Sequence, residues 1–176
     1  AIMHAAKKGD LDMVTLLYEY GANIWTKDSN GYTPLMDAVI SRNSDVVLFL
    51  LQEGADPNWI KNDTYTALKH VLSMIVLPET NDNSAEYILK LLLQYGADPD
   101  FGGESALAEA IDKGLEISAE KIFEYGPDLH FTKLNLEENL GMTLDENLRM
   151  FANRKGLYSI EKKIRSVYAN ITDNAR

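Results

Sequence analysis

The stretch Thr33-Pro34-Leu35-Met36-Asp37-Ala38 decides the fold, because a similar phrase opens several units along the chain. Thr33 can cap a helix with its hydroxyl, and Pro34 then stands at the first helical position, where its missing N–H has no consequence. Related openings stand at 66–71 (Thr-Ala-Leu-Lys-His-Val) and 105–110 (Ser-Ala-Leu-Ala-Glu-Ala), and Ile2-Met3-His4-Ala5 is a truncated one. The recurrence predicts one helix start per unit.

A second phrase, with glycine at its centre, closes each unit. It recurs around Gly21, Gly54, Gly96 and Gly126, which are 33, 42 and 30 residues apart. A glycine in the left-handed region ends a helix at little cost. Between the two phrases, apolar residues recur at helical spacing at 46–51 and again at 88–93. Each unit is therefore predicted to be a pair of helices.

Together these phrases resemble the ankyrin repeat, whose period is about 33 residues. The resemblance covers residues 1–130 and implies an all-α repeat solenoid of helix-turn-helix units with projecting hairpin-like loops. Four ankyrin repeats are predicted at about 1–29, 30–61, 62–100 and 101–130. Residues 131–176 lose the pattern, and we predict a divergent helical C-terminal cap there, with apolar positions such as Leu144, Leu148, Phe151, Ile160 and Ile164.

The third repeat departs from the others. Its opening and closing phrases are nine residues farther apart, which places an insertion near 76–84, with Pro78 ending one helix. Asn83 and Glu86 are predicted to form a capping box for the next helix. The insertion is either tolerated loop drift or a contact specific to one partner. Because the first repeat lacks its opening, the chain is expected to be a fragment or a processed product.

The chain carries a net charge of −10, which disfavours nucleic acid and suggests a protein partner with a basic patch. Residues 149–176 depart from this balance, with seven basic and two acidic side chains. They either solvate the cap and balance the acidic array or bind an acidic partner. There is no cysteine and no apolar run of membrane-spanning length, so no disulfide and no membrane association are predicted.

No arrangement of residues predicts catalysis, a metal site or a cofactor. His4 and His70 occupy equivalent positions two repeats apart, too far to share a metal, and both are expected to face solvent. Four acidic residues are expected to lie at helix starts, where the helix dipole favours negative charge: Asp10, Asp12, Asp45 and Glu116. We predict that the chain is not an enzyme.

The family resemblance implies a partner-binding concave face, built from loop tips and first helices. Tyr32 and Tyr65 are expected to contact the partner; Trp25 and Trp59 either do so or stiffen the loops. The predicted contact residues are Trp25, Lys27, Asn30, Tyr32, Asp37, Ile40, Trp59, Ile60, Asp63, Tyr65, Lys69, His70, Met74, Phe101, Glu104 and Asp112.

The predicted function is a protein–protein interaction module, with an inhibitor or immunity-type protein or a secreted effector as specific versions. The alternative is a regulatory or substrate-recruiting domain of a larger enzyme. We expect a monomer in the cytoplasm, or a secreted protein if it is an effector.

Overall fold

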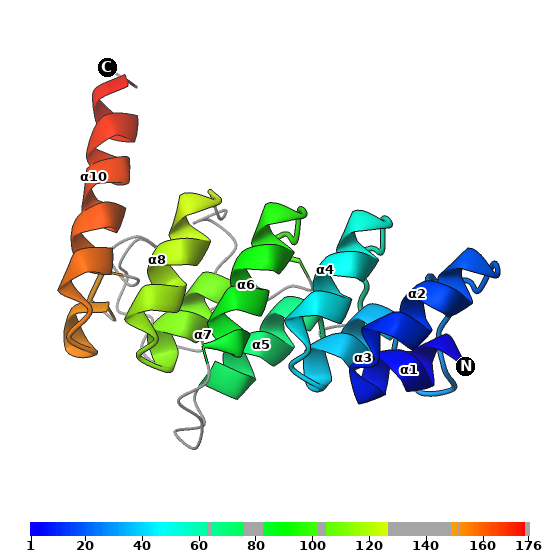
Figure 1. Cartoon of the computed structure of the whole chain (residues 1–176). Coiled ribbons are helices and arrows are strands. Elements are labelled where there is room, and N and C mark those ends of the chain that lie inside the picture. The colour runs from blue at the N-terminus through cyan, green and yellow to red at the C-terminus, as the bar shows by residue number, and fades with distance from the viewer. Residues whose placement is uncertain (63–64, 76–82, 102–104, 127–148, 151, 175–176) are drawn as a thin grey trace. The chain divides into compact units, whose positions relative to one another are not determined.

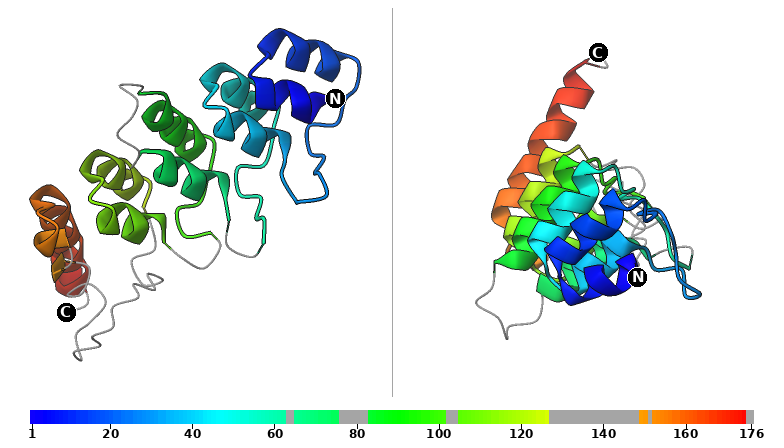
Figure 2. Two further views of the ribbon diagram at one scale, coloured as in Figure 1. Left: turned by 90° about the horizontal axis from the view of Figure 1, so that it is seen from below. Right: turned by 45° about the vertical axis from the view of Figure 1, so that its right-hand side comes forward.

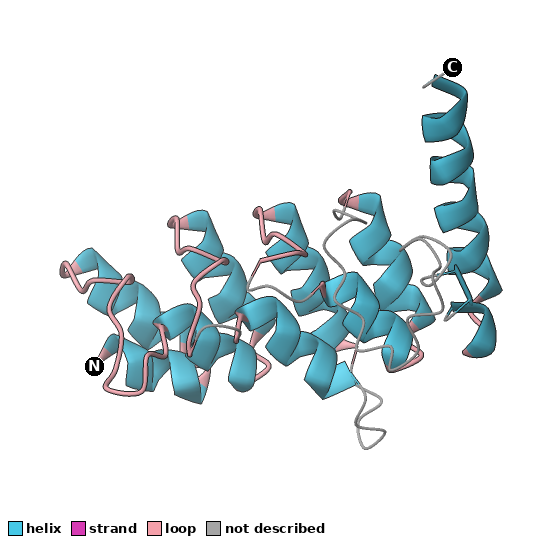
Figure 3. Cartoon of the chain, turned by 180° about the vertical axis from the view of Figure 1, so that it is seen from behind, coloured by secondary structure: helices cyan, strands magenta, loops and turns pink. Residues whose placement is uncertain are grey.

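The computed structural model describes residues 1–62, 65–75, 83–101, 105–126, 149–150 and 152–174, the stretch 167–174 as backbone only. The chain divides into two compact units, Ala1–Gly102 and Gly103–Arg176, called here the N-terminal and C-terminal units. Within the described ranges every regular element is a helix (Figure 3). None of these helices is both long and apolar enough to cross a membrane.

The N-terminal unit stacks three helix pairs side by side (Figure 1). The first helices of the pairs, α1, α3 and α5, contact one another in sequence and form one row. The second helices, α2, α4 and α6, form the other row in the same way. The bounds are α1 Ile2–Lys8, α2 Leu11–Glu19, α3 Pro34–Ile40, α4 Ser44–Gln52, α5 Ala67–Ile75 and α6 Ser84–Gln94. This is the predicted all-α ankyrin-type solenoid.

Helix starts follow the capping residues that the sequence indicates. The Thr33 hydroxyl accepts a hydrogen bond from the Met36 amide at 3.3 Å, with Pro34 as the first residue of α3. Asp10 caps α2 in the same manner, accepting from the Met13 amide at 3.0 Å. These contacts satisfy amide groups that have no partner inside a helix. The predicted helix-start positions of Asp12, Asp45 and Glu116 are also confirmed.

The predicted capping box at the start of α6 is wrong. Asn83 does occupy the N-cap position, but its side chain accepts no capping hydrogen bond. Its φ and ψ of −72° and 7° are turn-like, whereas a capping residue needs extended backbone to direct its side chain at the following amides. The inserted residues before it, including Pro78, lie outside the described residues.

Glycines end the second helices as predicted. Gly21, Gly54 and Gly96 have φ values of 84°, 85° and 87°, in the left-handed region that only glycine adopts without strain. In each repeat the next residue, alanine, donates its amide back to the helix, as Ala55 does to the Leu50 carbonyl at 2.9 Å. The chain then leaves the helix layer for the loop.

The core lies between the two rows of helices. Val46, Val47 and Leu50 of α4 are fully buried, and Ile88, Leu89 and Leu92 repeat this pattern in α6. Ala38 and Val71 are fully buried where first helices approach one another. Because each pair buries its apolar faces against neighbouring pairs, the stack supplies a core that no single pair has.

Polar contacts join successive pairs at the turn between first and second helices. The Ser41 hydroxyl donates to the Ala6 carbonyl at 3.1 Å, and the Asn43 amide group donates to the Gly9 carbonyl at 2.8 Å. Arg42 donates forward to the Met74 carbonyl at 3.3 Å. The turn of the second pair is therefore tied to both neighbours.

The C-terminal unit contains a fourth helix pair, α7 (Ala106–Asp112) and α8 (Glu116–Glu124), and the helix α10 (Tyr158–Asn174). α10 contacts α8 and buries Ile160 and Ile164. Basic residues of the C-terminal segment pair with acids of the helices: Lys155 with Asp112 at 3.3 Å, and Lys163 with Glu120 at 3.6 Å. Leu144, Leu148 and Phe151 lie outside the described residues.

Loops leave the N-terminal unit after α2 and after α4. Figure 2 shows both extending from the helix layer on one side. The first loop spans 20–33 and the second spans 53–66, of which 63–64 are outside the described residues. These two loops and the adjoining first helices carry most of the predicted contact residues.

Candidate protein-binding surface

Each loop begins with a side chain that folds it. The carboxamide oxygen of Asn23 accepts from the Trp25 amide at 2.7 Å, and the Asp56 carboxylate accepts from the Asn58 amide at 2.8 Å. Asp98 repeats the contact in the third repeat with the Asp100 amide at 2.9 Å. Short polar side chains that bond the backbone two residues on set up turns of this kind. The recurring Gly-Ala-Asn/Asp phrase therefore fixes the same loop entry three times.

The loop tips are narrow hairpins. Asp28 accepts from the amides of Asn30 and Tyr32 through one carboxylate oxygen, both at 2.9 Å, and its own amide donates to the Tyr32 carbonyl. In the second loop, Lys61 and Tyr65 exchange two backbone hydrogen bonds, of 2.8 and 3.0 Å. Since Asp28 and Lys61 stand 33 residues apart, as do Tyr32 and Tyr65, the two tips are built on one plan.

Both tryptophans join one loop to the other. The indole N–H of Trp25 donates forward to the Gly54 carbonyl at 3.0 Å, and that of Trp59 donates back to the Gly31 carbonyl at 3.0 Å. Asn58, which stands where Trp25 stands one repeat earlier, donates to the Gly96 carbonyl at 2.8 Å. Trp25 thus makes, with an indole, the link to the next repeat that Asn58 makes with an amide. These contacts agree with the stiffening role, which was one of the two alternatives predicted for the tryptophans. Trp25 itself remains 61% exposed.

Replacement of Trp59 by phenylalanine is expected to lower the free energy of unfolding by about 1 kcal/mol, because a half-buried hydrogen bond is lost while most of the ring is kept. The matched control is Trp25→Phe, which loses the same kind of bond at an exposed site and should cost about half as much or less. Urea unfolding followed by far-UV circular dichroism measures both. A loss for Trp25→Phe as large as that for Trp59→Phe would contradict the assignment.

Rings and cations gather where the second loop meets α5. The rings of Tyr32 and Tyr65 meet edge to face at 6.3 Å between centroids. The Lys61 ammonium lies 3.4 Å from the Tyr32 centroid and 5.6 Å from that of Tyr65. The Tyr65 hydroxyl is hydrogen-bonded to Nδ1 of His70. This set of four side chains is called the tyrosine cluster below.

Burial sets the protonation of this cluster. It raises the pKa of Tyr65 to about 12, with a smaller contribution from Tyr32, so the hydroxyl stays neutral at pH 7. Burial, together with the Arg42 cation, lowers the pKa of His70, so its imidazole is also neutral. The prediction that His70 faces solvent is wrong, because the loop ahead of α5 packs against it through Tyr65. His4, its equivalent in the first repeat, is exposed as predicted.

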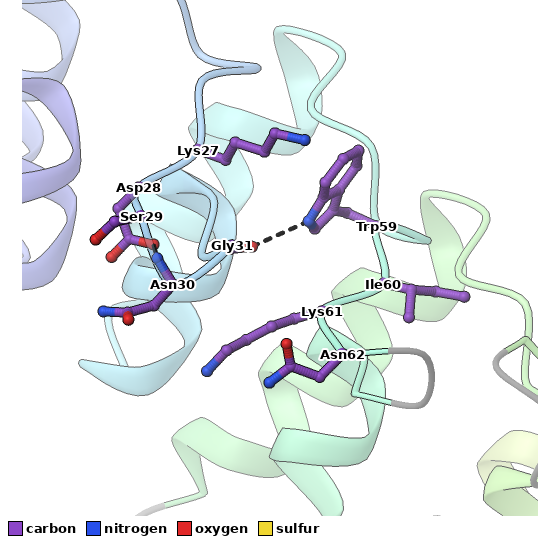
Figure 4. Close-up of a pocket in the computed structure, with 9 residues that line it drawn as sticks. All are labelled: Lys27, Asp28, Ser29, Asn30, Gly31, Trp59, Ile60, Lys61 and Asn62. Carbon is purple, nitrogen blue, oxygen red and sulfur yellow. Dashed lines mark hydrogen bonds between the residues drawn. The ribbon is translucent and has the colours of Figure 1, made fainter.

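A groove of about 540 Å³ opens between the two loop tips (Figure 4). Lys27 reaches across it from the first loop, and its ammonium lies 4.7 Å from the Trp59 ring centroid. Lys61 reaches back from the second loop to Tyr32. We call this feature the loop groove; its lining residues are Lys27, Asp28, Ser29, Asn30, Gly31, Trp59, Ile60, Lys61 and Asn62.

A smaller pocket of about 200 Å³ lies between the loop entries and the start of α3. Trp25 and Trp59 both line it, together with core residues such as Ile24 and Leu35. It is more enclosed and more apolar than the loop groove, and it lies at the base of the same two loops. Trp59 lines both cavities, so it lies between a hydrophobic base and a polar, lysine-lined groove.

The structure brings many of the predicted contact residues together. Lys27, Asn30, Trp59 and Ile60 line the loop groove, and Tyr32, Tyr65 and His70 form the neighbouring tyrosine cluster. Ile40 is half-buried on α3, and Phe101 is exposed in the third loop. Asp112 belongs to the C-terminal unit and pairs with Lys155. Asp63 and Glu104 lie outside the described residues.

Three of the predicted contact residues are buried, so their expected exposure is wrong. These residues are Asp37, Lys69 and Met74. Burial raises the pKa of Asp37, an effect that the Lys7 cation opposes. The helical spacing alone could not reveal that these positions are buried.

Lys61 is a residue of the groove that the sequence analysis missed. Its position opposite Tyr65 in the hairpin corresponds to that of Asp28 opposite Tyr32. The sequence did hold a signal for Lys61, because equivalent positions of the two repeats both carry a charged residue, Asp28 and Lys61. The structure makes it central, since Lys61 contacts both tyrosines and lines the groove.

Comparison with known proteins agrees with the helix pairs and their loops. A family model described as ankyrin repeats (3 copies) matches residues 1–61, the region that holds the first loop and part of the second. Residues 1–61 belong to the ankyrin-repeat family. Such repeats act in general as protein-interaction modules, because stacked repeats present an extended concave surface. Among the described residues of this ankyrin-repeat chain, no cluster of three or more His, Asp or Glu side chains could hold a metal ion.

Relatives share stretches of this chain with widely different proteins. It is similar to the human BCL-6 corepressor-like protein 1 (29% identity over 109 residues, 62% of this chain and 6% of that protein). It is also similar to the human 2-5A-dependent ribonuclease (40% over 57 residues, 32% and 8%) and to mouse protein phosphatase 1 regulatory subunit 27 (36% over 63 residues, 36% and 41%). The chain thus spans less than half the length of each of these relatives.

Proposed function

We propose that the N-terminal unit binds a protein partner through the loop groove, the tyrosine cluster and the adjoining first helices. The observation that carries this proposal is the loop groove itself, about 540 Å³ between two loops that are joined by tryptophan hydrogen bonds. A surface held in place before binding loses little conformational entropy when a partner docks. Tyrosine and tryptophan side chains, which dominate strong protein interfaces, are gathered here.

The charge of the chain supports a partner that carries a basic patch, because an acidic protein attracts such a partner over a distance and repels acidic ones. Acidic residues lie on the second helices of the N-terminal unit and at their caps, among them Asp10, Asp12, Asp45, Glu53 and Glu86. We propose that the chain acts as a monomer in the cytoplasm or as a secreted effector. An inhibitor or immunity-type role is a more specific version of this proposal.

The tyrosines test the proposal. A Tyr32→Ala/Tyr65→Ala variant is expected to bind its partner at least tenfold more weakly than the native chain, because two aromatic anchors are removed. Affinity capture from cells of the source organism followed by mass spectrometry identifies the partner, and titration calorimetry measures the affinity. Tyr20→Ala/Tyr87→Ala is the control; Tyr20 ends α2 and Tyr87 lies on α6, and both are exposed.

Circular dichroism must show that both variants are folded. Loss of the same partner from both variants would point to general destabilisation. Retention of the partner by the Tyr32/Tyr65 variant would contradict the proposal that this surface binds it. Loss only from the Tyr32/Tyr65 variant supports the proposal.

A second candidate function is a regulatory or substrate-recruiting domain of a larger enzyme. The observation that favours it is the similarity to a ribonuclease and to a phosphatase regulatory subunit, of which the chain spans only parts. The sequence of the complete gene tests this candidate directly. A catalytic domain in the same reading frame would support it, and the absence of such a domain would favour an independent protein-binding module.

A further inference from the structure

We propose that the loop groove binds a short acidic segment of the partner protein, whose carboxylates pair with Lys27 and Lys61. This inference rests on the proposed function and specifies the chemistry of what enters the groove. It differs from the expectation drawn from the net charge alone, since the local charge of the groove has the opposite sign to that of the chain.

Basic residues of the N-terminal unit are concentrated on one side of the helix pairs. The unit contains seven lysines and arginines, and only Lys90 lies on a second helix. The others lie on first helices, in the turn after α3 or in the two loops, and are Lys7, Lys8, Lys27, Arg42, Lys61 and Lys69. The lining of the loop groove holds two of these lysines and one carboxylate, Asp28, so this groove of an acidic protein is locally cationic.

Three described carboxylates on this side, those of Asp28, Asp37 and Asp56, are hydrogen-bonded or buried within the protein. Asp28 lines the loop groove, but one of its oxygens accepts hydrogen bonds from the amides of Asn30 and Tyr32, which partly neutralise its charge. Asp56 likewise accepts from the Asn58 amide at a loop entry. Asp37 is buried. None of them forms an ion pair with a groove lysine.

The two groove lysines are held in place without being neutralised. Lys27 lies over the Trp59 ring, and Lys61 over the rings of Tyr32 and Tyr65. Among the described residues, no carboxylate lies within ion-pair distance of either ammonium group. A cation–π contact orients an ammonium group but leaves its charge and N–H donors for another ligand. Two positioned cations facing one groove favour a ligand with more than one carboxylate.

The dimensions and the surrounding charge favour a short segment. A volume of about 540 Å³ lies within the range of about 300–1,000 Å³ that small-ligand sites occupy. At physiological salt, charges act over about 8 Å, so a short segment in the groove senses mainly the two lysines. A longer polyanion such as nucleic acid would extend beyond the groove and be repelled by the rest of the chain, whose net charge is −10. We therefore assign the groove to an acidic peptide.

The test uses the N–H resonances of the two indoles. Trp59 lines the loop groove and Trp25 does not, so Trp25 is an internal control within each spectrum. The probe is an acetylated, amidated tetraglutamate peptide, added to the ¹⁵N-labelled full chain and followed by proton–nitrogen correlation spectra. Trp59→Phe assigns the two resonances. Tetraglutamine is the uncharged control peptide.

Tetraglutamate is expected to shift the Trp59 resonance and leave that of Trp25 in place, with at least fivefold weaker binding to Lys27→Gln/Lys61→Gln. Lys8→Gln/Lys90→Gln, which removes the same charge elsewhere in the N-terminal unit, should bind within twofold of the native chain. No shift at millimolar tetraglutamate, an equal shift with tetraglutamine, or unchanged binding to the Lys27/Lys61 variant would overturn the inference.

A four-nucleotide thymidine oligomer distinguishes the other class of anion. Tighter binding of this oligomer than of tetraglutamate at the same residues would replace the acidic peptide with nucleic acid. If tetraglutamate fails while the Tyr32→Ala/Tyr65→Ala variant still loses its protein partner, only the acidic assignment is wrong and the proposed protein-binding surface stands. If that tyrosine variant keeps its partner, the proposed function fails instead.

Discussion

Leu50→Ala is expected to lower the free energy of unfolding by about 3 kcal/mol, within the range of roughly 2–5 kcal/mol that such truncations cost in well-packed cores. Leu50 is fully buried in α4, which contacts its own partner α3 as well as α2 and α6 in the neighbouring pairs. The cavity would therefore weaken three packing contacts at once. In a repeat array, stability is close to a sum over repeats and their interfaces, so a loss in the middle of the stack affects both neighbours.

Leu16→Ala is the matched control, because it removes the same atoms from α2 at a position that is 47% exposed. It is expected to cost less than about 1 kcal/mol, since little apolar surface returns to water. Urea denaturation with circular dichroism compares the two variants. Equal losses would mean that the second helices are not packed as described.

Gly9→Ala is the substitution with the second largest expected effect, about 2–3 kcal/mol. Two costs combine. Gly9 has a φ of 70°, a left-handed conformation that costs a residue with a Cβ roughly 1–2 kcal/mol. The added Cβ would also lie only 2.5 Å from Nδ2 of Asn43. That side chain donates to the Gly9 carbonyl and caps α4 by accepting from the Val46 amide at 3.0 Å, and losing a cap costs about 1 kcal/mol.

Gly21→Ala separates these two costs. Gly21 has a φ of 84°, but an added Cβ there would meet nothing within 4 Å, so only the conformational cost of roughly 1–2 kcal/mol remains. A double variant, Gly9→Ala/Asn43→Ala, should lose less than the sum of its single variants, because the clash and the cap involve the same side chain. Strict additivity in thermal or urea unfolding would contradict this coupling.

The parts of the fold that depend on neighbouring residues were predictable from the sequence. Thr33 and Pro34 start α3, and Gly21, Gly54 and Gly96 end second helices, because capping and left-handed backbone are decided within a few residues. The apolar spacing of Val46, Val47 and Leu50 placed the buried face in the same way. Asn83 shows the limit of this reasoning: the residue type was suitable, but the backbone leading into α6 is not extended.

The candidate protein-binding surface could be predicted only in outline. The loops and many of their residues were identified, yet the roles of Trp25, Trp59 and Lys61 depend on contacts between residues about 30 positions apart. The burial of Asp37 and Lys69 depends on how their helices pack in the folded unit. No local pattern encodes such contacts.

The sequence by itself determined that this protein is a stack of ankyrin-type helix pairs with projecting loops, because periodic apolar residues, caps and glycines act locally and repeat. It also determined a net charge of −10. Only the tertiary structure decided where that charge lies: it places Lys27 and Lys61 across one groove, each over an aromatic ring of the opposite loop, while nearby carboxylates are bonded or buried. Composition sums charges over the whole chain, whereas a bound segment responds to those within a few ångströms.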